Sequence, residues 1–206
     1  MKKQNLFFDF DGMKFNTLPA LVAYVNHRYE INTLPSEYIG NNDSLDVIIK
    51  KHSPNVNLSW EDIYIDVGKN FHSSIEWHEE VKPMDGMCEV ISLLSSKYKL
   101  FTVTARQKPG INVIQHLLDE YIPGCISHIH CAWEHHPVKG FIETSKRDFI
   151  LSVNGENIAF FDDSLNEIKK TADIIPSYLF DEMNIHENSG IENRINHWER
   201  IGEMFL

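Results

Sequence analysis

The sequence has few cysteines, few basic residues and no apolar run long enough to cross a membrane. Its three cysteines, Cys88, Cys125 and Cys131, do not imply a paired disulfide framework. Lysine and arginine number 19 against 30 aspartates and glutamates, so the net charge is −11 and a phosphate-backbone partner is disfavoured. The apolar run after Asn5 is too short for a signal peptide. We expect a soluble cytoplasmic protein that binds neither long nucleic acid nor membrane; its oligomeric state is left open.

An unbroken apolar run near the N-terminus leads into two carboxylates and a glycine, in the order Leu6-Phe7-Phe8-Asp9-Phe10-Asp11-Gly12. Such a run is typical of a parallel strand buried on both faces. Ligands of open α/β sheets bind at the carboxyl ends of strands, and a glycine there permits a sharp turn. An EF-hand loop is excluded because residues 13–16 contain no acids. The two carboxylates therefore predict a site for a hard divalent cation, usually Mg²⁺.

Residues 15–81 carry helical spacing and no convincing strand. We expect a helix with Thr17 as its N-cap, a second at about residues 44–51, and a third opened by a capping box of Ser59 and Asp62 and reaching Ile75. We interpret this segment as a helical cap that is inserted into a core made of residues 1–14 and 82–206. The cap is expected to swing about its connections near Phe15 and Lys82-Pro83.

Beyond residue 82 the pattern alternates between helix and strand. Strands are expected at 99–103, 126–130, 157–161 and 178–180, and a last helix is expected to carry Ile191, Ile195, Trp198, Ile201 and Phe205. This alternation predicts an α/β fold with a Rossmann-like, doubly wound parallel sheet.

Polar side chains follow three of the expected strands. They are Asp9 and Asp11, then Thr104, then the pair Asp162 and Asp163. The carboxyl ends of parallel strands share one edge of a sheet, so these groups can converge there. Lys146 starts the helix that precedes the last acidic strand. This combination is typical of enzymes that transfer phosphoryl groups, which use carboxylates, a hydroxyl and a lysine around a cation.

In these motifs the chain resembles the phosphatases of the haloacid dehalogenase superfamily. The matching residues are Asp9-Phe10-Asp11-Gly12, Thr104 in Phe-Thr-Val-Thr-Ala-Arg, Lys146, and Asp162-Asp163, and the insertion resembles a C1-type cap. The resemblance implies that Asp9 is the nucleophile and that Asp11 is the general acid and base. It also implies an Mg²⁺ cofactor held by Asp9, the main-chain carbonyl of Asp11 and Asp162, with Asp163 bound directly or through water. Thr104, Ala105, Arg106 and Lys146 are expected around the phosphoryl group of a small phosphorylated substrate.

Several alternatives stay open. Lys139 competes with Lys146 for the lysine role, and Arg106 could either contact phosphate or cap its loop. The Asp-Asp pair and the ending Arg-Ile-Asn-His-Trp-Glu-Arg-Ile are similar to deoxyribonucleotidase-like proteins, which favours a nucleoside monophosphate as substrate. A sugar phosphate or another small metabolite is the enzymatic alternative. A binding or regulatory protein without turnover is the non-enzymatic one.

A cluster of cysteines and histidines between residues 125 and 136 suggests zinc at first sight. Its members are Cys125, His128, His130, Cys131, His135 and His136. Their spacing does not fit paired zinc-ligand motifs, and packing on a strand and loop is the favoured interpretation.

Overall fold

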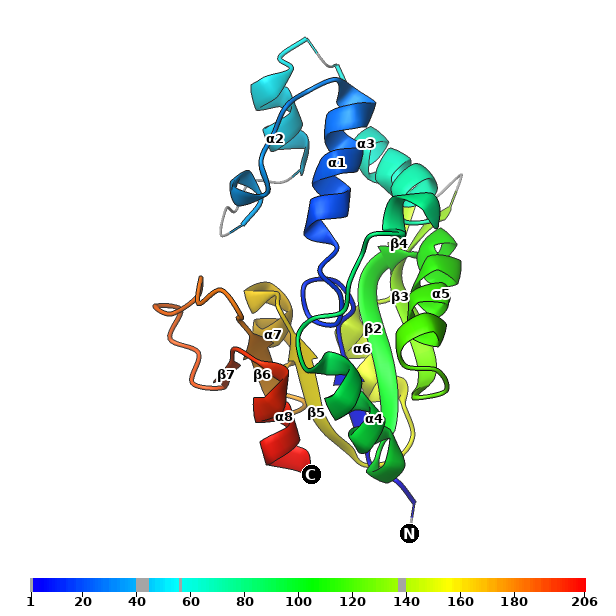
Figure 1. Cartoon of the computed structure of the whole chain (residues 1–206), viewed down its shortest axis with the longest axis vertical. Coiled ribbons are helices and arrows are strands. Elements are labelled where there is room, and N and C mark those ends of the chain that lie inside the picture. The colour runs from blue at the N-terminus through cyan, green and yellow to red at the C-terminus, as the bar shows by residue number, and fades with distance from the viewer. Residues whose placement is uncertain (1, 40–44, 56, 137–139) are drawn as a thin grey trace.

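A seven-stranded sheet forms the centre of the protein, in the order β4-β3-β2-β1-β5-β6-β7 (Figure 1). The computed structural model describes residues 2–39, 45–55, 57–136 and 140–206. The strands are β1 (Asn5–Phe8), β2 (Lys99–Gln107), β3 (Ile126–His136), β4 (Gly140–Glu143), β5 (Asn157–Asp162), β6 (Ser177–Phe180) and β7 (Arg194–Ile195). Six of these strands run parallel, and β4 pairs antiparallel with β3 at one edge. The predicted doubly wound α/β fold is confirmed.

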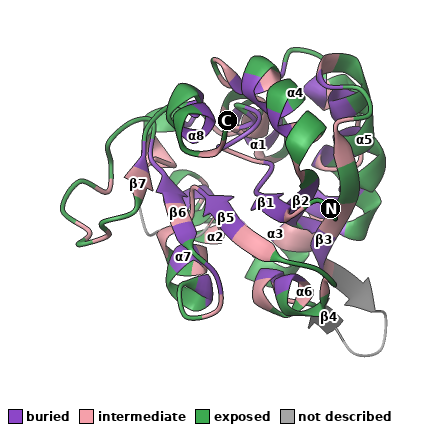
Figure 2. Cartoon of the chain, turned by 90° about the horizontal axis from the view of Figure 1, so that it is seen from below, coloured by how far each residue is buried: buried purple, intermediate pink, exposed green. Residues whose placement is uncertain are grey.

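Helices cover both faces of the sheet (Figure 2). On one face lie α4 (Met87–Lys97), α5 (Ile111–Tyr121) and α8 (Trp198–Phe205), whose buried side chains share one hydrophobic core. On the other face lie α6 (Lys146–Ser152) and α7 (Leu165–Thr171), which contribute to a second core. A short 3₁₀ turn, η4 (Lys108–Gly110), leads into α5. No helix among the described residues has the length and apolar character of a membrane span.

The position of β1 explains its sequence. It pairs with β2 on one side and β5 on the other, so the winding of the sheet reverses at β1. All four of its residues are buried. Phe8 stacks on Phe161 and Trp198 on one face, and Phe7 stacks on Phe101 on the other. An uninterrupted apolar run is what such a central strand requires, and the loop after it lies where doubly wound folds bind ligands.

Residues 18–78, which we call the helical insertion, contain no strand in their described part. Their elements are α1 (Leu18–Tyr29), η1 (Pro35–Glu37), α2 (Leu45–His52), α3 (Trp60–Asp66), the π-helical η2 (Val67–Phe71) and η3 (Glu76–His78). They pack around their own buried cluster, which includes Tyr24, Ile49 and Phe71. Figure 1 shows the insertion above the edge of the sheet where β1 ends. The two connections to the sheet lie side by side, because Phe15 bridges Pro83 and the amide of Asn16 donates to the carbonyl of Lys82 at 3.1 Å.

Two sequence-based boundaries were wrong. The last helix begins at Trp198 rather than near Ile191, because Ile195 pairs with Phe180 as part of β7. The extended residue His197 then caps the helix, its Nδ1 accepting from the amide of Arg200 at 3.3 Å. The capping box of Ser59 and Asp62 is confirmed, but α3 ends at Asp66 and continues only as the π-helical turn η2.

Candidate active site

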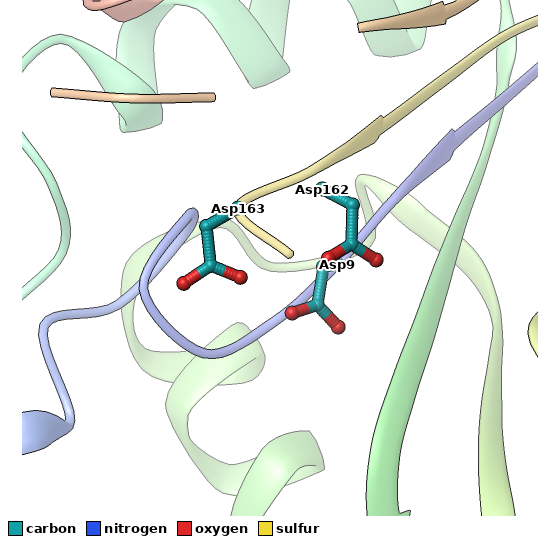
Figure 3. Close-up of side chains that lie close together, drawn as sticks. All are labelled: Asp9, Asp162 and Asp163. Carbon is teal, nitrogen blue, oxygen red and sulfur yellow. The ribbon is translucent and has the colours of Figure 1, made fainter. Parts of the chain in front are cut away.

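Three carboxylates from two strand ends meet beside β1. Asp9 follows β1, Asp162 is the last residue of β5, and Asp163 comes next (Figure 3). One oxygen of each lies within 4.8 Å of the others, the one such group of potential metal ligands in the part of the chain that the structure describes. The main-chain amide of Asp9 donates to the carbonyl of Phe161 at 2.9 Å, which ties the loop after β1 to β5. The structure therefore brings the predicted acids together.

Lys146 lies between two of these acids. Its Nζ donates to Oδ1 of Asp9 at 2.8 Å and to Oδ2 of Asp162 at 2.7 Å. Burial disfavours the ammonium, but the two carboxylates outweigh burial and hold the pKa of Lys146 above its ordinary value. Ser145, whose hydroxyl accepts from the amide of Asp148, caps α6 and so fixes the start of the helix that carries Lys146. The competing Lys139 lies outside the described residues.

Burial and the mutual repulsion of the carboxylates disfavour their charged forms. Burial raises the pKa of Asp162 to about 7, although Lys146 opposes it. Burial, followed by the charges of Asp9 and Asp162, raises the pKa of Asp163 well above its ordinary value. The pKa of Asp9 is also raised by burial. One ammonium does not offset three acids, of which Asp9 and Asp162 are buried and Asp163 is half-buried. Oxygen ligands in this number are those that a hard divalent cation prefers. The donor set fits Mg²⁺.

Asp11 does not belong to this group of three; its carboxylate is held by Arg106. The guanidinium donates from Nε to Oδ2 at 2.9 Å and from Nη2 to Oδ1 at 2.8 Å. Thr17, the predicted N-cap of α1, makes no capping bond and donates its hydroxyl to Oδ1 of Asp11 at 2.6 Å instead. Burial works to raise the pKa of Asp11, but Arg106 outweighs it and holds the pKa well below its usual range.

Arg106 itself is almost fully buried and is shared with the helical insertion. Its Nη2 lies 3.1 Å from Nε2 of His78, whose Nδ1 lies 2.8 Å from the carbonyl oxygen of Ser74. The Ser74 carbonyl can only accept, so Nδ1 carries the hydrogen and Nε2 accepts from the guanidinium. Burial, and then the charge of Arg106, lowers the pKa of His78 to about 4. The structure thus places Arg106 against the carboxylate of Asp11.

The remaining motif residues lie on β2. Thr104 is buried, and its Oγ accepts from the amide of Arg106 at 3.1 Å. Phe8 pairs with Thr102, so Thr104 lies two residues further along, beside the loop that carries Asp9 and Asp11. The carbonyl of Ala105 accepts from the hydroxyl of Tyr64 in α3 at 3.2 Å, a contact between the sheet and the insertion.

Lys14 is a residue that the sequence analysis missed. Its side chain is completely buried, and its Nζ donates to the carbonyls of Asp9 at 2.6 Å and Phe8 at 3.1 Å. Burial lowers its pKa to about 7, although Asp9 opposes the shift. Its position between the apolar residues Met13 and Phe15 does not by itself mark it as buried. Lys14 supports the main chain of the loop after β1.

Two histidines of β3, His128 and His130, serve packing. The ring of His130 stacks on Phe149 with centroids 4.1 Å apart, and its Nε2 lies 3.0 Å from the carbonyl of Thr144. His128 stacks on the same phenylalanine. Within the described residues, no group of the cluster at 125–136 comes close enough to share an ion. The side chains of His135 and His136 lie outside the described part.

A cavity of about 360 Å³ opens beside Asp11, Gly12 and Asp163. This volume is within the range of small-molecule sites. Gly12 has φ of +65°, and a β-carbon on it would lie 2.0 Å from Oδ2 of Asp163, so the turn requires glycine. The opposite walls come from the helical insertion and from residues 180–186, which follow β6.

Comparisons with known proteins agree with this geometry. Structures of similar fold include a predicted phosphatase from Clostridium acetobutylicum (TM-score 0.69, 15% identity, 99% of this chain and 98% of the other). Another is a predicted phosphoglycolate phosphatase from Haemophilus somnus (TM-score 0.68, 15% identity, 100% and 99%). A third is named as the HAD-hydrolase YfnB from Bacillus subtilis bound to magnesium (TM-score 0.65, 14% identity, 100% and 99%).

At these identities the likeness concerns the fold alone. No curated protein matches the sequence. The family model described as haloacid dehalogenase-like hydrolase matches residues 6–174, which include Asp9, Thr104, Lys146 and Asp162. The chain therefore belongs to the haloacid dehalogenase-like hydrolase family.

Proposed function

We propose that this hydrolase is a magnesium-dependent phosphomonoester phosphatase that works through an aspartyl-phosphate on Asp9. The observation that carries the proposal is the contact of Lys146 with both Asp9 and Asp162 at the point where the sheet reverses its winding. A free carboxylate oxygen of Asp9 attacks phosphorus, and the bond from phosphorus to the ester oxygen breaks. Water then attacks the phosphorus of the aspartyl-phosphate, which releases phosphate and restores Asp9.

Asp9, Asp162 and Asp163 would hold the magnesium ion, with the main-chain carbonyl of Asp11 as a further oxygen ligand. When bound, the ion screens the repulsion between the carboxylate and the phosphoryl group and stabilises the charge that develops. Lys146 keeps Asp9 ionised and neutralises the phosphoryl oxygens. Thr104, Ala105 and Arg106 stay predictions as phosphate contacts. The bidentate bond to Asp11 makes Arg106 better suited to positioning that acid.

Asp11 is proposed to give a proton to the leaving ester oxygen and later to take one from the attacking water. In the present arrangement its carboxylate is ionised and bound by Arg106 and Thr17. Transfer of a proton from Asp11 therefore requires these bonds to loosen as the ester enters. Thr17 directly precedes the helical insertion and His78, the outer partner of Arg106, ends it, so movement of the insertion would reach Asp11.

We divide the chain into a catalytic core of residues 1–14 and 82–206 and a cap of residues 15–81 that closes over the ester. Nucleoside monophosphates are the proposed substrates, and the cavity beside Asp11 has room for a small organic leaving group. The alternative is a sugar phosphate or another small metabolite; phosphoglycolate is the ester named for three proteins of similar fold.

The test is phosphate release from p-nitrophenyl phosphate with and without Mg²⁺, followed by a screen of nucleoside monophosphates and sugar phosphates. We expect Mg²⁺-dependent turnover that is abolished in Asp9→Asn. A wild-type rate equal to that of Asp9→Asn would refute the phosphatase assignment. Equal efficiency on mononucleotides and the other esters would refute only the nucleotidase assignment.

A further inference from the structure

The cavity beside Asp11 has an unusual charge balance for a site that receives an anionic ester. Among the described residues that line it there is neither lysine nor arginine. Four of them are acidic, namely Asp11, Asp163, Asp181 and Glu182. Much of the remaining wall is apolar, with contributions from Leu21, Ile39, Phe71, Met84, Phe180 and Met183. A second anionic group on the substrate would find no lysine or arginine among these described residues, whose basic members are His72 and His186.

The nearest cations are already engaged by the protein. Lys146 bonds to Asp9 and Asp162, and Lys14 bonds to main-chain carbonyls. Arg106 bonds to Asp11 through Nε and Nη2, while its buried Nη1 has no hydrogen-bond partner within the described residues. None of the three lines the cavity. Lys146 and the proposed metal serve the phosphoryl group, so neither is left for a charge at the far end of the ester.

The far wall, formed by the segment after β6, is itself acidic. The carboxylate of Asp181 already has partners there. It accepts hydrogen bonds from the amides of Ile185 and His186 at 2.8 and 2.9 Å, and it forms an ion pair with Arg194 at 3.3 Å. Glu182 is exposed next to it, and partial desolvation, followed by the charge of Asp85, raises the pKa of Glu182. Glu182 therefore gives this wall its uncompensated negative charge.

The insertion side of the cavity offers an uncharged polar group. Nδ1 of His72 is buried and, within the described residues, has no hydrogen-bond partner. Burial, followed by the charge of Arg106, lowers the pKa of this ring to about 3, so the ring is neutral at physiological pH. A neutral imidazole can bond to a hydroxyl or an amide but supplies no charge for a carboxylate.

From this lining we infer that the enzyme takes phosphate esters whose leaving group carries no negative charge, either a neutral alcohol with an apolar part or a cationic amino alcohol. Glu182 and His72 are the residues that select it. A carboxylate-bearing ester such as phosphoglycolate is excluded by charge. The inference rests on the proposed phosphatase function, and it names the substrate class for the same site.

Three esters test the inference because they share a primary alkyl phosphate and differ mainly in the charge of the distal group. They are 2-phosphoglycolate, 2-hydroxyethyl phosphate and 2-aminoethyl phosphate. Each is measured as a competitive inhibitor of p-nitrophenyl phosphate hydrolysis at about pH 8, where a histidine of ordinary pKa is neutral. We expect an inhibition constant for 2-phosphoglycolate at least about tenfold higher than those for the other two. An equal or lower constant for 2-phosphoglycolate overturns the inference while the phosphatase stands. No hydrolysis of p-nitrophenyl phosphate would overturn the proposed function itself.

The second part of the test reverses the charge of Glu182 on the far wall. In Glu182→Lys we expect the inhibition constant for 2-phosphoglycolate to fall by about tenfold relative to that for 2-aminoethyl phosphate. Glu187→Lys makes the same charge change in the same segment, on an exposed residue that does not line the cavity, and should leave the ratio unchanged. Equal shifts in both variants would show that general surface charge, and not Glu182, sets the preference.

Discussion

Arg106 binds the carboxylate of Asp11 with two hydrogen bonds, at 2.9 and 2.8 Å. The side chain of Arg106 is 1% exposed, and its guanidinium lies 5.0 Å from the ring centre of Phe10 and 6.0 Å from that of Phe71. Because Phe71 and His78 belong to the helical insertion, the environment of the proposed general acid is built partly by the insertion. The bound position keeps the carboxylate of Asp11 ionised.

Asp11→Asn should affect esters according to their leaving groups. An alkyl phosphate needs a proton on its leaving oxygen, whereas p-nitrophenolate leaves without one. We expect kcat/KM to fall by about 10²–10⁴ for an alkyl phosphate and by much less for p-nitrophenyl phosphate. Steady-state kinetics on both esters measure the difference.

The same substitution leaves Arg106 without its carboxylate partner, so thermal melting must first show that the variant is folded. Thr17→Val serves as a milder control because it removes one bond to Asp11 and keeps the acid. Equal losses on both esters in a folded Asp11→Asn protein would count against proton transfer to the leaving group.

Asp163→Asn should stabilise the metal-free protein. The folded-state pKa of Asp163 is raised, so the folded form binds more protons than the unfolded one, and this contribution to stability is lost as pH rises above about 3.8. At about pH 8 the substitution should remove this repulsion and raise Tm by roughly 2–4 °C. At about pH 5 the gain should be smaller. Thermal melting in a chelator checks both.

With added Mg²⁺ the wild type should melt at a higher temperature than Asp163→Asn, because the wild type binds the ion with a carboxylate that the variant lacks. Glu187 is an exposed acid away from the site, so Glu187→Gln serves as the control. It should change the Tm neither with nor without Mg²⁺. A metal-free Asp163→Asn protein that melts below the wild type at about pH 8 would contradict the repulsion described here.

The histidines His72 and His78 of the insertion should make stability fall in acid. Their folded-state pKa values, about 3 for His72 and about 4 for His78, lie below the ordinary value of 6.5. The unfolded chain therefore takes up protons first, and stability that is complete above about pH 6.5 is lost as pH falls toward 4, at up to about 1.4 kcal/mol per pH unit for each ring.

His78→Gln retains an acceptor for Arg106 without titrating, so its Tm should depend less steeply on pH over this range. The exposed His116→Gln should keep the wild-type slope. If His78→Gln and the wild type show parallel pH dependence, His78 is not neutral in the folded protein.

The sequence predicted the sheet and the gathering of acids because both depend on local patterns. The apolar run at residues 6–8 and the strand at 157–161 each end directly in aspartates, and parallel winding alone brings such ends to one edge. Lys146 was found by its place at the start of a helix before the acidic strand.

Partners that come from distant segments could not be predicted. The bond from Arg106 to Asp11 joins residues 95 positions apart, and the bond from Arg106 to His78 depends on how the insertion packs. Lys14 was missed because nothing in a single sequence shows that a lysine between apolar residues is turned inward. The last helix was placed too early because Ile191 and Ile195 continue its apolar spacing, while pairing with β6 makes Ile195 a strand residue.

The central claim is that Asp9 carries the phosphoryl group during turnover. The most direct measurement is mass spectrometry of enzyme quenched in acid while it hydrolyses p-nitrophenyl phosphate with Mg²⁺, because acid preserves an acyl phosphate. The account predicts one phosphoryl group on the peptide that contains Asp9, absent when Mg²⁺ is withheld and absent in Asp9→Asn. Steady turnover with no phosphoryl group on that peptide, or undiminished turnover by Asp9→Asn, would contradict it.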